Sequence, residues 1–176
     1  MNSFFWGFVI MLFDINISLG QGTIGLLPDF VGYLFLINGF NLMAQEGQRF
    51  IKTKPYAVFM AAYSLILYVL NIFGLTAALG GMGLLIEITA LAVSWGVEYE
   101  IIKGIQDMED RYDEYLNGDM LMVTWIVQVV ATLATLIFMF FETISFISSV
   151  ASLVAAVVFV IQFYRAKQYY YAGDNS

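Results

Sequence analysis

Four carboxylates lie within or beside long apolar runs, where a membrane protein rarely tolerates a charge: Asp14, Asp29, Glu87 and Glu142. Ionisable groups inside membrane spans usually face the bundle interior or a water-filled cavity, where they contact ions, solutes or neighbouring helices. We therefore predict that these four acids form a ligand-binding set in the outer half of the membrane. For Asp29, which follows Pro28 directly, a helix cap is the competing interpretation, because aspartate stabilises a helix N-terminus.

Glu87 is the hardest of the four to explain by capping, because a long apolar stretch follows it. Ser94 and Glu98 follow at offsets of seven and eleven residues, which places all three on one face of a helix. Two interpretations stay open for Glu87. It is either a polar lock that joins helices or a contact to a ligand or ion.

The chain contains no cysteine and no histidine, which limits its chemistry. Disulfides, thiol nucleophiles, imidazole bases and the usual zinc and haem ligands are therefore excluded. An intramembrane aspartyl protease would need two facing acids that share a proton, a role open to Asp29 and Glu87. A glutamate is unusual there, and the Gly-x-Gly-Asp and Tyr-Asp motifs of those enzymes are absent from the spans. We predict no catalytic residue, no metal site, no cofactor and no enzymatic activity.

The composition of the chain predicts that membrane-spanning helices position these acids. The chain of 176 residues is 61% hydrophobic and 12% charged, with a mean hydropathy of +0.81, whereas soluble domains carry about 25% charged residues. Apolar runs near the ~20 residues needed to cross a bilayer recur along it. We predict one all-α domain over residues 1–176, a polytopic membrane bundle of six spans arranged as three hairpins. The spans are 3–19, 29–45, 55–77, 82–102, 120–141 and 145–164.

The basic residues predict the orientation. All seven lie between spans two and three, between four and five, or after span six: Arg49, Lys52, Lys54, Lys103, Arg111, Arg165 and Lys167. With six spans, those segments share one side of the membrane, which the positive-inside rule makes cytoplasmic. We expect a multi-pass protein with both termini in the cytoplasm. The chain has no basic patch for nucleic acid.

An acidic segment, residues 97–119, holds eight acids and two bases, for a net charge of −6. Apolar residues recur along it at steps of three and four, which predicts that span four continues into the cytoplasm as an amphipathic helix. One interpretation is that this face packs against the protein's own loops. The other is that it docks a basic protein partner, through Ile101, Ile105, Met108 and Tyr112.

The stretch "GLLPDFVGYLFLINGFNLM", Gly25 to Met43, resembles a family of uncharacterised small polytopic membrane proteins of Firmicutes-type bacteria. The matching motif is Leu-Pro-Asp-Phe-x-Gly-Tyr, here Leu27, Pro28, Asp29, Phe30, Gly32 and Tyr33. The resemblance covers about the first quarter of the chain and implies a bacterial plasma membrane. It supplies no substrate and no catalytic residue.

Two functions remain in competition. The first is a non-enzymatic membrane protein that acts by protein–protein interaction or regulation, through its spans and the acidic helix. The second is a subunit that binds or transports a small solute, similar to the substrate-binding components of energy-coupling-factor transporters. The Ala-rich coupling motif of those components has no counterpart in "FFWGFVIMLF", Phe4 to Phe13.

Overall fold

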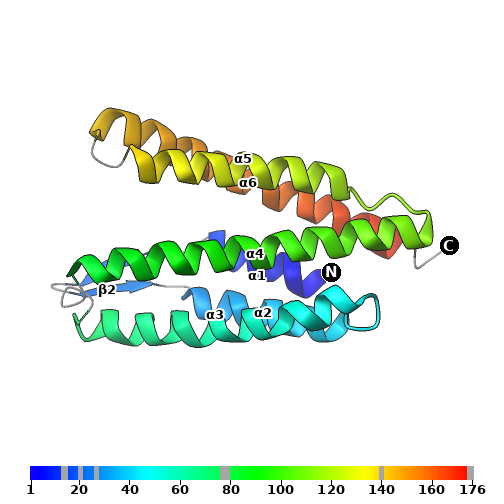
Figure 1. Ribbon diagram of the computed structural model, residues 1–176, viewed down its shortest axis with the longest axis horizontal. Helices are drawn as coiled ribbons and strands as arrows, with labels where there is room; N and C mark the ends of the chain where they lie inside the picture. The colour runs from blue at the N-terminus through cyan, green and yellow to red at the C-terminus, as the bar shows by residue number, and fades with distance from the viewer. Residues whose placement is uncertain (13–15, 20–21, 26–27, 76–79, 139–140, 174–176) are drawn as a thin grey trace. The chain divides into compact units, whose positions relative to one another are not determined.

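The computed structural model describes residues 1–12, 16–19, 22–25, 28–75, 80–138 and 141–173 (Figure 1). These residues form six helices and one two-stranded sheet, so the predicted all-α class is confirmed apart from this small hairpin. The helices are α1 (Asn2–Leu12), α2 (Asp29–Leu42), α3 (Gln48–Ile72), α4 (Gly80–Tyr112), α5 (Gly118–Ile137) and α6 (Glu142–Gly173). The chain divides into two compact units, Met1–Ile101 and Ile102–Ser176, and α4 runs from the first into the second.

Four helices, α3 to α6, are long and apolar enough to cross a membrane. Only 11 to 17% of the residues in their most apolar windows are buried within the protein, and large apolar side chains such as Ile66, Leu85, Ile137 and Phe146 are exposed. Exposed apolar surface on this scale requires an apolar solvent. The chain is therefore a candidate multi-pass membrane protein in contact with lipid.

The first predicted span, 3–19, is wrong as a continuous helix. Helix α1 ends at Leu12, and Asn16–Leu19 forms strand β1, which pairs antiparallel with β2 (Gly22–Gly25). The sequence explains the change, because this region combines polar residues, glycines and β-branched residues, with Ile17 opposite Ile24. With 11 and 14 residues, α1 and α2 are about 16 and 21 Å long, shorter than the roughly 30 Å hydrocarbon core.

Glycines bring α1 and α2 into close contact. A methyl group on Gly32 would lie 2.5 Å from Met11 Cγ and 3.0 Å from the carbonyl oxygen of Gly7. At Gly39, an added methyl group would meet the Phe4 ring, 2.5 Å from Cε1. Small residues allow backbones to approach in this way in membrane proteins, where the hydrophobic effect does not drive helices together.

An aromatic cluster joins this helix pair to the start of α3. The Phe4 ring packs edge-on against Phe40 at 5.0 Å and stacks on Phe50 at 5.9 Å. All three side chains are fully buried.

Helix α3 begins seven residues before the predicted boundary, so Pro55 lies inside the helix rather than at its start. The missing N–H of Pro55 removes one bond to the carbonyl of Ile51, an exposed residue.

In the second unit, α5 and α6 form an antiparallel hairpin of helices (Figure 1). The hydroxyl groups of Thr132 and Ser152 are 2.9 Å apart, and they hydrogen-bond across the pair. Ser148 and Ala155 are buried on the same helix. Small side chains on α6 therefore support helix packing.

Candidate functional site

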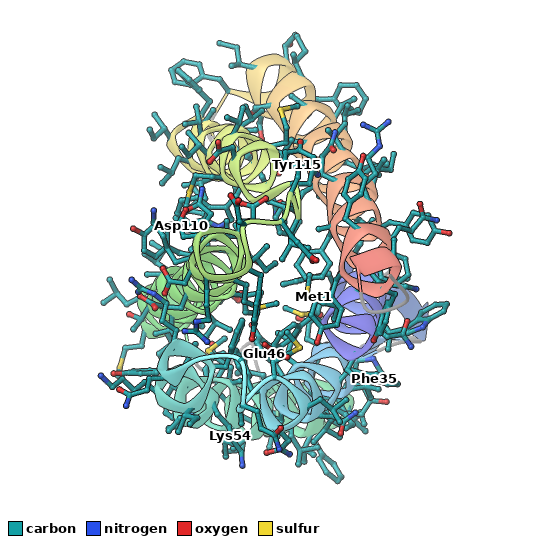
Figure 2. The ribbon with its side chains drawn as sticks, turned by 90° about the vertical axis from the view of Figure 1, so that its right-hand side faces the viewer. Met1, Phe35, Glu46, Lys54, Asp110 and Tyr115 are labelled. Atoms are coloured by element: carbon teal, nitrogen blue, oxygen red, sulfur yellow. The ribbon has the colours of Figure 1, made fainter. Side chains whose placement is uncertain are left out.

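The most exposed charged feature of the second unit is the end of α4 and the turn after it. We call residues 107–115 the acidic turn. Five acids and one arginine give it a net charge of −4. Seven of its nine residues are exposed: Asp107, Asp110, Arg111, Tyr112, Asp113, Glu114 and Tyr115. Asp110 lies in the last turn of α4, and Tyr115 lies in the segment that leads to α5 (Figure 2).

Glu109 fixes the conformation of the acidic turn. Its carboxylate oxygen Oε1 accepts hydrogen bonds from the backbone N–H groups of Leu116, at 2.6 Å, and Gly118, at 3.0 Å. Asn117, the N-cap of α5, gives no side-chain cap of its own and has a left-handed backbone conformation with φ of 70°. Glu109 on the preceding helix therefore satisfies one N–H group that the start of α5 leaves open, that of Gly118, and also the N–H of Leu116 in the turn.

Asn117 and Tyr115 attach the acidic turn and the residues after it to α6. The Asn117 side-chain amide donates to the backbone oxygen of Gln162, at 3.2 Å, and to its side-chain oxygen, at 3.1 Å. The Tyr115 hydroxyl donates to Asn117 Oδ1 at 3.0 Å, and its ring packs edge-on against Tyr169 at 5.4 Å. Asn117 and Gln162 are buried, so their hydrogen bonds are shielded from water. The acidic turn is thus held in one conformation.

The four residues predicted to bind a partner divide into two groups. Ile101, Ile105 and Met108 are buried, with at most 1% of their surface exposed, whereas Tyr112 is 50% exposed. The apolar face of the acidic helix is therefore covered, which agrees with the packing interpretation at three of the four positions. A role in partner binding stays a prediction for Tyr112 and now extends to the exposed acids beside it.

A second polar cluster lies in the first unit and connects α2, α3 and α4. The Tyr33 hydroxyl donates to Ser94 Oγ at 3.0 Å, and Tyr33 is also close enough to Tyr63 and Glu98 for electrostatic interaction. Glu98 is only 7% exposed. The Tyr63 hydroxyl is buried and has no hydrogen-bond partner among the described residues. We call Tyr33, Tyr63, Ser94 and Glu98 the polar cluster.

Of the four acids predicted to bind a ligand, two act electrostatically on tyrosines of the polar cluster. Asp29, the first residue of α2, is exposed and acts electrostatically on Tyr33. Glu87 is exposed on α4 and acts electrostatically on Tyr63. Asp14 lies outside the described residues. Glu142 is the first residue of α6, and its side chain is outside the described part.

Sequence reasoning missed several of these residues. Glu109 is one of eight acids in its segment, and only the fold shows that it caps α5. The dipeptide Asn117-Gly118 is a recognised turn signal, so the turn itself was detectable. Tyr33 belongs to the resembling motif, but nothing in the sequence pairs it with Ser94. No group of three or more acids in the described ranges is arranged to hold a metal ion.

Comparison with protein-family models, curated protein sequences and solved structures finds no match to this chain. The acidic turn and the polar cluster are therefore the two candidate sites of this protein.

Proposed function

We propose that this chain is a non-enzymatic membrane protein that binds a basic protein partner at the acidic turn. The observation that carries the proposal is the cap by Glu109, which holds a strongly acidic, exposed segment in one conformation. A preorganised surface loses less conformational entropy on binding than a flexible one does. Exposed Tyr112 and Tyr115 add rigid aromatic area, which interfaces favour.

The length of α4 supports a position in the aqueous phase for this surface. Arg49 on α3 pairs with Glu100 on α4 at 3.0 Å, and this ion pair marks the basic side of the first unit. From Glu100 to Tyr112 the helix advances about 18 Å. This stretch of α4 contains six charged residues, a composition that fits water rather than lipid.

The compartment follows from the charge distribution and the motif. Every lysine and arginine lies in segments that a multi-pass topology gathers on one side, and the positive-inside rule assigns that side to the cytoplasm. We assign both termini and the acidic turn to the cytoplasm. The resemblance of Leu27–Tyr33 to the Firmicutes-type family supports a bacterial plasma membrane.

The test is site-specific photocrosslinking in the host membrane, with a photoreactive residue at Tyr112 and a control at exposed Ile137. We expect one protein to crosslink at Tyr112 and not at Ile137. Substituting both Asp110→Asn and Asp113→Asn should reduce its yield at least several-fold. Absence of any protein crosslink at Tyr112 would overturn the proposal.

The second candidate function is binding of a small solute at the polar cluster. The specific observation in its favour is the buried Tyr63 hydroxyl without a hydrogen-bond partner in the described ranges, close to Glu87. Buried polar groups without partners are rare, and a ligand is one way to satisfy them. Native mass spectrometry of gently extracted protein tests this function. A retained solute should be lost in Tyr63→Phe and Glu87→Gln, and retention in both variants would exclude this site.

A further inference from the structure

The start of α3 joins unpaired basic charge to exposed aromatic area. Lys52, Tyr56, Phe59, Tyr63 and Ile66 follow one another at offsets of four, seven, eleven and fourteen residues, which places them along one face of the helix. We call these five residues the α3 stripe. Its lysine stands before Pro55, and its aromatic residues lie within the apolar region.

Most side chains of the α3 stripe are exposed, and only Tyr63 is half-buried. Tyr56, Phe59 and Ile66 are each about 60% exposed, at 60%, 59% and 60%. The Phe59 and Tyr63 rings stack at 6.5 Å with an angle of 15° between their planes. The two rings therefore lie nearly parallel, about two and three helical turns after Lys52.

The basic residues at the start of α3 differ in whether they already have an acidic partner. Arg49 is engaged with Glu100. Lys52 and Lys54, by contrast, form no ion pair with any described residue. Lys52 is exposed, and Lys54 points away from the other helices of the first unit (Figure 2). The Lys52 ammonium group is therefore free to bind an anion at the level where the apolar part of α3 begins, whereas Lys54 lies on another side of the helix.

We propose that the α3 stripe binds an anionic phospholipid, with its phosphate at Lys52 and an acyl chain along Tyr56, Phe59 and Ile66. Charge and depth both fit this ligand, because the Lys52 ammonium group lies where the apolar part of α3 begins and the aromatic residues follow it into the apolar region. The protein carries a net charge of −7, so general attraction to an anionic membrane does not explain such binding. This site is independent of the partner proposed for the acidic turn.

The experiment uses the full chain in vesicles of phosphatidylcholine with phosphatidylglycerol as a minor component. After gentle extraction, mass spectrometry gives the ratio of the two lipids that remain bound. We expect phosphatidylglycerol to be enriched over its share of the vesicle. A lysine near the surface contributes about 1 kcal/mol, so Lys52→Gln should lower the enrichment about fivefold. Lys54→Gln, on another side of the helix, should lower it less.

Three variants make the outcome decisive. Lys52→Arg should keep the enrichment, because the charge remains. Lys167→Gln should also keep it, although it removes the same charge from α6, where Lys167 Nζ lies 5.3 Å from the centre of the Tyr164 ring. The pair Tyr56→Ala and Phe59→Ala should lower it with both lysines intact. Free glycerol phosphate should not compete, since it lacks a chain.

Two results would overturn the proposal. One is a bound lipid ratio equal to that of the vesicle for the unmodified protein. The other is an equal loss in Lys52→Gln and Lys167→Gln, which would reduce the effect to net charge. Helix content measured by circular dichroism in each variant confirms that the compared proteins are folded.

Discussion

Glu109, in the last turns of α4, and Gly118, the first residue of α5, are joined by a hydrogen bond of 3.0 Å from the backbone N–H to the carboxylate. The same carboxylate oxygen also accepts from Leu116. One side chain therefore closes the turn between two helices and caps the second of them.

Removing this cap should destabilise the second unit. Glu109→Ala leaves two N–H groups without their acceptor, so we expect the free energy of unfolding to fall by about 1–3 kcal/mol. Glu109→Gln keeps an acceptor without charge and should lose less. Thermal unfolding in detergent, followed by near-ultraviolet circular dichroism, measures the change. Asp110→Ala, an exposed neighbour, should change it by less than about 0.5 kcal/mol; equal losses at both positions would contradict the cap.

A side chain at Gly118 should not fit. An added methyl group would lie 2.7 Å from Gln106 Cγ and would also meet the Glu109 carboxylate. We expect Gly118→Ala to destabilise the protein by about 1–3 kcal/mol through overpacking. Gly96→Ala is the matched control, because no atom outside its own helix backbone lies within 4 Å of the added methyl group. It should be neutral or stabilising by up to about 1 kcal/mol. The same unfolding assay ranks the two variants, and the reverse order would be inconsistent with the packing described.

Close packing of α1 on α2 should depend on Gly32 and Gly39. Gly39→Ala places a methyl group against the Phe4 ring, and Gly32→Ala places one against Met11. Either change should push α1 away and raise hydrogen exchange of its amides, at a cost of about 1–3 kcal/mol. Gly81→Ala, at an open position, should leave exchange in α1 unchanged. Unaltered protection in Gly32→Ala and Gly39→Ala would show that the helices do not approach this closely.

The Tyr33–Ser94 hydrogen bond should contribute measurable coupling between α2 and α4. A double-mutant cycle with Tyr33→Phe and Ser94→Ala isolates it, with an expected interaction free energy of about 0.5–1.5 kcal/mol. Thr132→Val with Tyr33→Phe is a suitable control pair, since Thr132 bonds Ser152 in the other unit. The control pair should be additive. Additivity of Tyr33→Phe with Ser94→Ala as well would mean that the bond is not formed.

The sequence predicts much of the helical framework because membrane helices have a strong signal. Long apolar runs identify α3 to α6, and the amphipathic pattern after span four correctly predicts that this helix continues beyond residue 102, although it ends at Tyr112 rather than near residue 119. The signal fails at residues 16–19, which the predicted first span included but which form strand β1. Mean hydropathy does not distinguish a short helix with a hairpin from a full span.

The candidate sites were less predictable, for a different reason. A list of acids does not reveal which carboxylate faces inward: Glu109 caps α5 while its neighbour Asp110 is exposed. Ile101, Ile105 and Met108 have the spacing of a docking face, yet burial within the chain satisfies the same pattern. Spacing identifies an apolar face but not what covers it, because that depends on segments far apart in the sequence.

Helix α4 carries residues of both candidate sites. Tyr33 and Arg49 hold it in the first unit through Ser94 and Glu100, and its far end carries the acidic turn. The backbone hydrogen bonds of this helix therefore support both sites, and a proline at a position between them, such as Lys103, should weaken both at once.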